Sequence, residues 1–266
     1  MSQGYDRIYG EFDSPDMRRV RAEAYDEDIG QHSWVTANEL RRDVGRLGLQ
    51  SKHHLLDLGC GPCGPLTFVV RSIECRATGV DVSGDAVVLG QRRAASLDVD
   101  HLATIRHADL DDRLAFDDGS FDAAMSLDVV LHLGDRRALF REVARVLKPR
   151  SKLLFTDAGV LAGTISNAEA AARGTHGPTY FVAPGFNERA LDEAGFRLLE
   201  TEDRTNGVAE IAAGRLRARL AQREAFERSE GSAPFADHVR YLETVVALSQ
   251  RRALTRIMYL AESHGR

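Results

Sequence analysis

The strongest constraint on the fold is an alternation of short apolar runs with helical repeats between residues 52 and 157. The runs have the length of strands, and the stretches between them space their apolar residues as helices do. Strands that alternate with helices predict an α/β fold, a mostly parallel sheet with helices on both faces. Such sheets bind ligands at the carboxyl ends of their strands. We expect strands at 54–58, 77–81, 101–107, 121–127 and 152–157, and helices at 85–97 and 135–147.

The two flanking regions follow other patterns. Residues 1–50 are polar, with helical spacing over 14–25 and 36–47, and are expected to pack as a helical segment against something larger. Residues 158–186 contain several glycines and prolines and are predicted to be irregular. Beyond them we expect a helix from Asn187 to about Gly195, a strand over 196–203, helices over 206–230 and 235–252, and a last strand over 254–261.

Composition narrows the environment and the partners. The net charge of −5, with both signs mixed along the chain, argues against a nucleic-acid or anionic-membrane partner. No apolar run reaches the length of about 18 residues that spans a bilayer, and the first residues lack the order of a secretion signal. Three cysteines, an odd number in a long chain, fit a reducing compartment. We therefore expect a cytoplasmic monomer or homodimer.

The most informative segment is the glycine loop after the first strand, Asp57-Leu-Gly59-Cys60-Gly61-Pro-Cys-Gly64. Its glycine spacing matches the fingerprint of dinucleotide-binding proteins, with Asp81 near the position of the ribose-binding acid, so NAD is one candidate cofactor. Asp57 favours S-adenosylmethionine instead. A carboxylate there would repel a pyrophosphate, whereas it suits the α-ammonium of a methionine moiety. The alternative role for Asp57 is to accept hydrogen bonds from loop amides.

Two further aspartates follow the next two predicted strands. Asp81 is suited to accept both ribose hydroxyls, and Asp109 to accept the exocyclic amine of adenine, with Leu110 against the ring. A single aspartate after a strand is commonly a helix cap or a turn residue. Three aspartates after three successive strands form a stronger pattern, which favours a nucleoside site.

These segments together resemble the class I, Rossmann-like S-adenosylmethionine-dependent methyltransferases, over about residues 52–157. The resemblance implies a seven-stranded sheet with one antiparallel strand, a nucleoside-binding core over 51–157, and a region 158–266 that completes the sheet. Residues 1–50 and the insertion 206–252 would form a lid over the substrate. One departure is Cys63, where the family usually has glycine. The motifs that carry the resemblance are 55–61, 79–83, 108–110, 118–122 and 139–149.

The resemblance also implies a set of residues that bind S-adenosylmethionine. Tyr25, Gln31 and Trp34 would contact it from the entry segment, although Trp34 can also be read as an ordinary packing aromatic. The contacts from the core would be Asp57, Gly59, Cys60, Gly61, Gly64, Asp81, Val82, Ser83, Asp109, Leu110 and Leu127.

The expected reaction is an in-line displacement that moves a methyl group to an amine or hydroxyl of a small molecule. His132 is the candidate base, or it holds the acceptor by a hydrogen bond. Asp157 is its candidate assistant, or it pairs with an ammonium, and both can equally be structural residues. Asp128 is expected to orient a loop, and the segment with Arg173 and His176 is a place where substrate contacts tend to occur.

Two sequence features argue against a metal site and against a nucleic-acid substrate. No metal site is expected, because Cys60 and Cys63 lack a second pair of ligands. The fourth strand ends in Ser-Leu-Asp-Val and lacks the Asn/Asp-Pro-Pro-aromatic run of methyltransferases that act on nucleic-acid bases. The alternatives kept open are an NAD-dependent oxidoreductase and a catalytically silent relative that binds S-adenosylmethionine.

Overall fold

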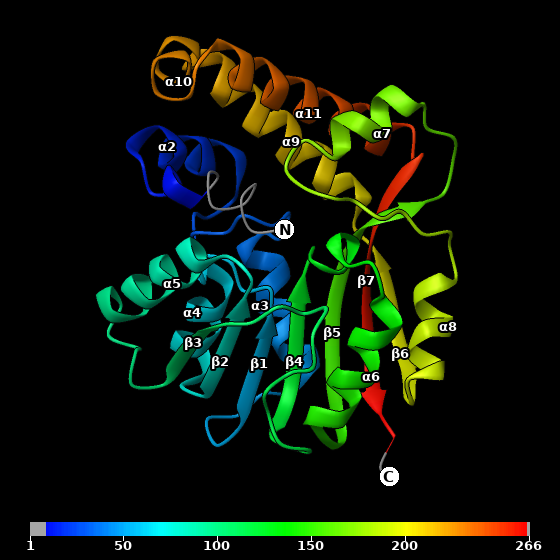
Figure 1. Ribbon diagram of the computed structural model, residues 1–266. Helices are drawn as coiled ribbons and strands as arrows, with labels where there is room; N and C mark the ends of the chain where they lie inside the picture. Colours follow the sequence, from blue (N-terminus) through cyan, green and yellow to red (C-terminus); the bar gives the residue numbers. More distant parts are fainter. Residues whose placement is uncertain (1–8, 265–266) are drawn as a thin grey trace.

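A seven-stranded sheet organises the protein, in a computed structural model that describes residues 9–264 (Figure 1). The first eight residues of the expected N-terminal segment and the last two residues of the chain lie outside the described part. The strand order is β3-β2-β1-β4-β5-β7-β6, and β7 runs antiparallel to β5 and β6 while the remaining neighbours are parallel. The strands are β1 His54–Leu58, β2 Arg76–Asp81, β3 Ala103–His107, β4 Phe121–Leu127, β5 Leu147–Leu161, β6 Phe196–Asp203 and β7 Leu254–Ser263.

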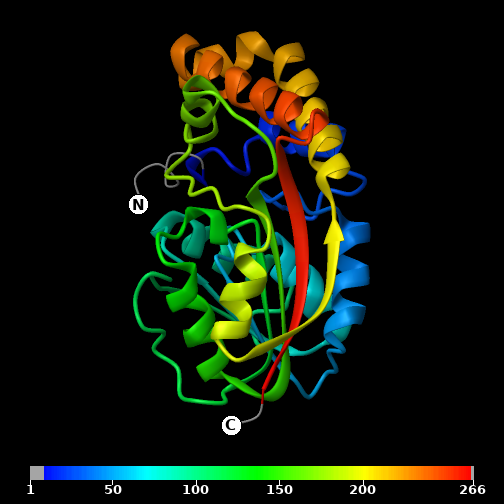
Figure 2. The same ribbon diagram turned by 90° about the vertical axis from the view of Figure 1, so that its right-hand side faces the viewer.

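Helices cover both faces of this sheet (Figure 2). Strand side chains alternate between the faces, so Leu55 packs with α3, α4 and α5 on one side, while Leu56 and Leu58 pack with α6 and α8 on the other. Each of these leucines is fully buried, which stabilises the fold by about 1.5–3 kcal/mol per side chain. The covering helices are α3 Ala37–Leu47, α4 Gly64–Ile73, α5 Gly84–Ser96, α6 Arg136–Val146 and α8 Phe186–Glu193.

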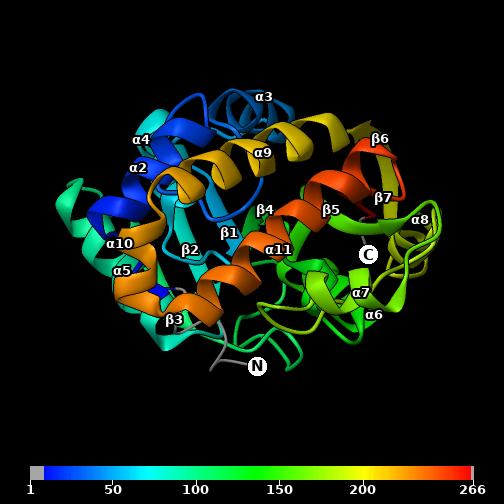
Figure 3. The ribbon, with the colours of Figure 1, turned by 90° about the horizontal axis from the view of Figure 1, so that it is seen from above.

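A second layer of helices, which we call the lid, lies across the carboxyl ends of the parallel strands. Seen from above, α9 and α11 cross the sheet, with α2 on one side of them and α7 on the other (Figure 3). Arg215 of α9 joins the lid to the N-terminal segment, because its guanidinium donates to the Tyr25 hydroxyl and to the His32 and Ser33 carbonyls. The lid helices are α2 Pro15–Ala24, α7 Asn167–Arg173, α9 Thr205–Ala221, α10 Arg223–Glu230 and α11 Ser232–Gln250.

Local sequence signals explain why several helices begin where they do. The Ser14 side chain caps α2 and Pro15 follows it, while Thr36 caps α3 and Ser83 caps α5. These side-chain oxygens accept hydrogen bonds from amides of the first helical turn, which have no partner within the helix.

Four predicted segments differ from the structure. The region 158–186, predicted to be irregular, contains the helix α7. Strand β5 extends to Leu161, well beyond the expected 152–157, because β7 pairs along its length. The predicted helix over 206–230 is interrupted at Gln222 and forms α9 and α10. Asn187 does not cap α8: Gly185 does so with a φ of +82°, and Asn187 is buried with its side chain on Asp157.

Candidate active site

A cavity lies between the sheet and the lid, where the strands of the parallel part end. Its wall on the sheet side includes Asp57, Gly59, Asp81, Asp109 and Leu127. Its wall on the lid side includes Trp34, Arg173, His176 and Tyr241. The structure therefore brings residues from the first loop, the N-terminal segment, α7 and α11 to one cavity. In Figure 1 the helices α7, α9 and α11 lie above the ends of the parallel strands.

The glycine loop forms a close turn at the bottom of this cavity. Gly59 has a φ of +72°, and an added Cβ there would lie 2.5 Å from the Val129 side chain. The amides of Gly59 and Cys60 donate to the Val80 carbonyl at 2.8 and 3.0 Å, which fixes the loop to the end of β2. Only glycine fits Gly59 without strain, because other residues rarely adopt this backbone conformation. The loop thus exposes bare backbone to the cavity.

Asp57 is the most unusual side chain in the cavity wall. It is 2 % exposed, and no hydrogen bond or ion pair from residues 9–264 reaches its carboxylate. The amides of the loop are directed elsewhere, so the structure does not support the alternative in which Asp57 accepts them. Burial, followed by the nearby charge of Asp81, raises the pKa of Asp57 to about 8. A cation that entered the cavity would provide the partner that this carboxyl group lacks.

Asp81 differs because its carboxylate is held by the backbone. It accepts hydrogen bonds from the Gly61 amide at 2.8 Å and from the Ser83 amide at 2.9 Å. These bonds hold the side chain at the end of β2. Asp109 accepts from the Asp111 amide at 3.0 Å and lines the cavity beside Leu110.

The remaining predicted contacts divide into two groups. Cys60, Gly61, Val82 and Leu127 line the cavity. Gly64 and Ser83 are not part of its wall: Gly64 allows the carbonyl of Gly30 to approach closely, and Ser83 caps α5.

Of the three predicted contacts from the N-terminal segment, Trp34 lines the cavity and also stacks on Tyr241, with ring centroids 6.4 Å apart. Tyr25 and Gln31 do not reach the cavity wall. The Tyr25 hydroxyl donates to the Ser33 carbonyl at 2.6 Å, and the Gln31 side chain bridges the Ile29 amide and the Glu27 carbonyl. Both therefore shape the segment that presents Trp34.

His132 is in the cavity wall, at the end of the short 3-10 helix Val130–His132. Its Nδ1 lies 2.8 Å from the Pro178 carbonyl. Because a carbonyl only accepts hydrogen bonds, Nδ1 carries the proton, and the lone pair of the neutral ring is on Nε2. Burial is the main cause that lowers the pKa of His132. The imidazole is therefore neutral at pH 7 and able to accept a proton.

Asp157, the expected assistant, is placed away from this chemistry. It is fully buried, and it does not line the cavity. Its carboxylate accepts hydrogen bonds from Arg136 at 2.5 Å, from Asn187 at 2.7 Å and from the Gly159 amide at 2.8 Å. These partners occupy both oxygens, so we assign Asp157 a structural role and not a catalytic one.

Comparisons with known proteins identify the family of this chain. The Methyltransferase domain family matches residues 56–155. A sequence relative is O-methyltransferase resE of Aspergillus sclerotiorum, 31% identical over 66% of this chain and 67% of that protein. The glycine/sarcosine/dimethylglycine N-methyltransferase of Actinopolyspora halophila is 29% identical over 65% of this chain, which spans only 31% of that relative. The structure of a cyclopropane synthase from Mycobacterium tuberculosis superposes with a TM-score of 0.82 at 15% identity, over 99% of both chains, which shows the shared fold.

The chain belongs to the class I S-adenosylmethionine-dependent methyltransferases. Membership confirms the resemblance seen in the sequence, including the expected seven-stranded sheet and the cofactor, and it decides against the NAD-dependent oxidoreductase. The residues of the cavity also fit this cofactor. The buried Asp57 carboxyl group, which has no protein partner among the described residues, matches a cationic amino group, and the glycine loop allows a ligand to lie close to the backbone. None of the helices within residues 9–264 has the length and apolarity needed to cross a membrane.

The position that departs from the family pattern also has an explanation in this methyltransferase. Cys63 adopts the left-handed conformation, with a φ of +60°, at the start of α4. This is the conformation that glycine adopts most easily, which accounts for glycine in other members. The Cys63 thiol, 3.6 Å from the Gly61 carbonyl, is fully buried in the core. Cys63 therefore adopts a backbone conformation that glycine would take at this position.

Several residues in the wall of the methyltransferase cavity, or directly behind it, had little or no signal in the sequence. Asp128, expected to orient a loop, accepts hydrogen bonds from the Trp34 amide at 2.9 Å and from Arg256 at 2.8 Å. Arg256 comes from β7 and Tyr241 from α11, far away in the chain, and no local pattern marks either. Arg173 ends α7, which begins with a capping box at Ser166 and Glu169. That Ser-x-x-Glu pattern is the signal by which the helix could have been found.

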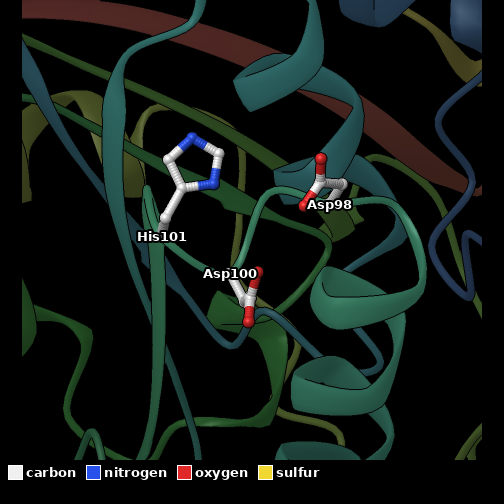
Figure 4. Close-up of side chains that lie close together, drawn as sticks. All are labelled: Asp98, Asp100 and His101. Atoms are coloured by element: carbon white, nitrogen blue, oxygen red, sulfur yellow. The ribbon is translucent and has the colours of Figure 1, made fainter.

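One group of potential metal ligands exists among the described residues, away from the methyltransferase cavity. Asp98, Asp100 and His101 have ligand atoms within 4.8 Å of one another in the turn between α5 and β3 (Figure 4). All three are exposed, and the turn precedes the amino end of β3, at the opposite edge of the sheet from the cavity. Exposed acidic groups of this kind are common without an ion, so we assign no metal to them.

Proposed function

We propose that this methyltransferase transfers a methyl group from S-adenosylmethionine to a nitrogen or oxygen atom of a small molecule enclosed between the sheet and the lid. One continuous cavity supports this proposal, because donor-side residues and lid residues share its wall. The two relatives named above are described as acting on an amine and as an O-methyltransferase, respectively. The proposed acceptor atom is therefore either a nitrogen or an oxygen.

Three carboxylates at successive strand ends are proposed to hold the donor. Asp57 would bind the α-ammonium, Asp81 the ribose hydroxyls, and Asp109 the exocyclic amine of adenine with Leu110 against the ring. The single observation that carries this assignment is the buried Asp57 carboxyl group, whose raised pKa reflects the lack of a partner. Val82 and Leu127 would complete the wall around the nucleoside.

The bound cofactor supplies a methyl group that is activated by a positively charged sulfur. The contribution of the protein is then mostly to hold the acceptor at attack distance and to exclude water. Trp34 and Tyr241 close the cavity from the lid side. Nε2 of His132 is proposed to take the proton of a hydroxyl acceptor, whereas a neutral amine attacks without a base.

The proposal is tested by binding and turnover together. Calorimetry is expected to show that the wild-type protein binds S-adenosylmethionine and does not bind NAD. Incubation with panels of primary amines and phenols is then expected to form S-adenosylhomocysteine and a methylated product. Donor binding without turnover on any small acceptor, including those of a cell extract, would indicate a silent relative and contradict the proposal. Asp57→Asn serves as the control, because it lacks the side-chain carboxylate that is proposed to bind the α-ammonium of the donor.

A further inference from the structure

The buried arginines of this protein differ in one respect that concerns the cavity. Six arginines are buried among the described residues. Arg173 is the exception among them, because no carboxylate of residues 9–264 forms an ion pair with it. The other five each have a carboxylate partner within 4.0 Å, and they are Arg21, Arg136, Arg204, Arg219 and Arg256.

Arg173 is held in place by an aromatic residue of the lid. It is the last residue of α7 and is 5 % exposed. Its Nη1 donates to the Tyr241 hydroxyl at 3.0 Å, and its guanidinium carbon lies 5.3 Å from the centre of the same ring. Both side chains are part of the cavity wall. A guanidinium remains charged when it is buried, so its positive charge faces the cavity without an anion to balance it.

The surrounding groups do not supply this anion. Asp128 is the carboxylate of the cavity wall at the lid end, and its oxygens are occupied by Arg256, the Thr156 hydroxyl and the Trp34 amide. His132 lines the same end as a neutral ring, because burial lowers its pKa and the charge of Arg173 lowers it further.

The two ends of the cavity have opposite charge. At the acceptor side, the charge of Arg173 contributes to the lowered pKa of His132. At the donor side, burial and the charge of Asp81 raise the pKa of Asp57. The donor side is therefore acidic and matches a cationic tail. The acceptor side carries one uncompensated positive charge and matches an anion.

We infer that the methyl acceptor carries a carboxylate group, which binds the Arg173 guanidinium with the Tyr241 hydroxyl beside it. One guanidinium neutralises one negative charge, and a planar carboxylate matches its paired N–H donors. A phosphate dianion would leave one negative charge without a partner, because a single guanidinium balances a single charge. This inference rests on the proposed function, because it names the class of acceptor for that same site.

The test compares charged and neutral molecules of the same shape. Acetate and acetamide, and benzoate and benzamide, are titrated into the protein loaded with S-adenosylhomocysteine, with binding followed by calorimetry or ligand-observed NMR. Each carboxylate is expected to bind at least about tenfold more tightly than its amide, because a charged hydrogen bond is lost with the amide. Arg173→Gln is expected to abolish this preference, and Arg173→Lys to retain most of it.

A matched control separates the charge from the lid. Arg219 is a buried arginine of α9 that pairs with Glu230 and does not line this cavity. Arg219→Gln is therefore expected to alter lid stability and to leave the preference for carboxylates intact. If Arg173→Gln does not fold, the comparison of acids with amides on the wild-type protein still decides the question.

Four results would overturn the inference. Amides that bind as well as the acids, or no binding of either at millimolar concentration, would show that Arg173 does not select an anion. Phenyl phosphate binding more tightly than benzoate would assign the charge to a phosphate. If Arg173→Gln loses as much affinity for S-adenosylhomocysteine as for the test carboxylates, the charge of Arg173 would be assigned to the carboxylate of the donor molecule. Failure of the wild-type protein to bind the donor would instead refute the proposed function.

Discussion

Binding of the donor is predicted to expel a proton from Asp57. With a pKa of about 8, this carboxyl group is about 90% protonated in the ligand-free protein at pH 7. An ammonium partner requires the ionised form, so each binding event releases about 0.9 proton at this pH. The amino group of the ligand, with an ordinary pKa of about 8, takes up roughly 0.1 proton in return. The expected net release is about 0.8 proton at pH 7, falling to about zero at pH 8.

The affinity for the donor should depend on pH through the same two ionisations, of the Asp57 carboxyl group and of the ligand amino group. Below pH 7 it rises by nearly tenfold for each pH unit, because the protonated carboxyl group must ionise before it can pair. The dissociation constant is then lowest near pH 8, where both groups are at their midpoints.

Calorimetry with S-adenosylhomocysteine measures the released proton directly. The apparent binding enthalpy at pH 7 is recorded in phosphate, HEPES and Tris, whose ionisation enthalpies differ, and its slope against those enthalpies gives the number of protons. Asp57→Asn should remove the slope. Asp109→Asn, at a cavity aspartate that accepts a hydrogen bond from the Asp111 amide, should weaken binding and keep the slope. Identical enthalpies in the three buffers would refute the reasoning, because no proton would then leave Asp57.

The same carboxyl group links stability to pH. Its pKa is higher in the folded protein than in the unfolded chain, so the folded state binds more protons between about pH 4 and pH 8. The contribution of Asp57 to the free energy of unfolding is therefore present at low pH and decreases as the pH rises through this range. The ligand supplies the missing partner, and we expect S-adenosylhomocysteine to raise the melting temperature more at pH 8 than at pH 6.

Three further predictions follow from the geometry. His132→Gln should lower kcat for a hydroxyl acceptor by about 10²- to 10⁴-fold and leave an amine acceptor within a few fold, as measured with matched phenol and amine substrates; equal losses would remove the base from the mechanism. Gly59→Ala should abolish donor binding, whereas Gly119→Ala, at a similar φ of +65° but in open space, should keep it; equal donor affinities in the two variants would argue against close approach at the loop. Arg256→Met should lower the free energy of unfolding by about 3–5 kcal/mol in denaturant titration, because it leaves Asp128 buried without its cation and Glu39 with Arg204 alone, at 3.9 Å; a loss below about 1 kcal/mol would count against this network.

The sheet was predictable because its signal is local. A short apolar run followed by a glycine turn or a helix has a length and a spacing that can be read without the partner strand, and β1, β4 and β6 lie close to the predicted ranges. That Asp57 and Asp81 line one cavity could be predicted for the same reason, since parallel strands end at one edge of the sheet. The far end of β5 could not, because its extension depends on pairing with β7, about a hundred residues later.

The roles of residues whose partners are far away in the chain could not be predicted from local sequence patterns. Asp157 follows a strand of the parallel sheet, where an assistant of His132 was expected, and only the tertiary structure places Arg136 and Asn187 against it. Arg173 and Tyr241 belong to α7 and α11, and only the contact between these helices brings both side chains into the cavity wall. Local patterns reveal that such residues exist, and the packing of the lid determines their partners.

The most direct test of this account is a crystal structure of the protein with S-adenosylhomocysteine. We expect the ammonium of the ligand at about 3 Å from the Asp57 carboxylate and the space beyond its sulfur atom lined by Trp34, His132 and Arg173. An ammonium directed away from Asp57, or a ligand sulfur that faces a wall without these residues, would contradict it.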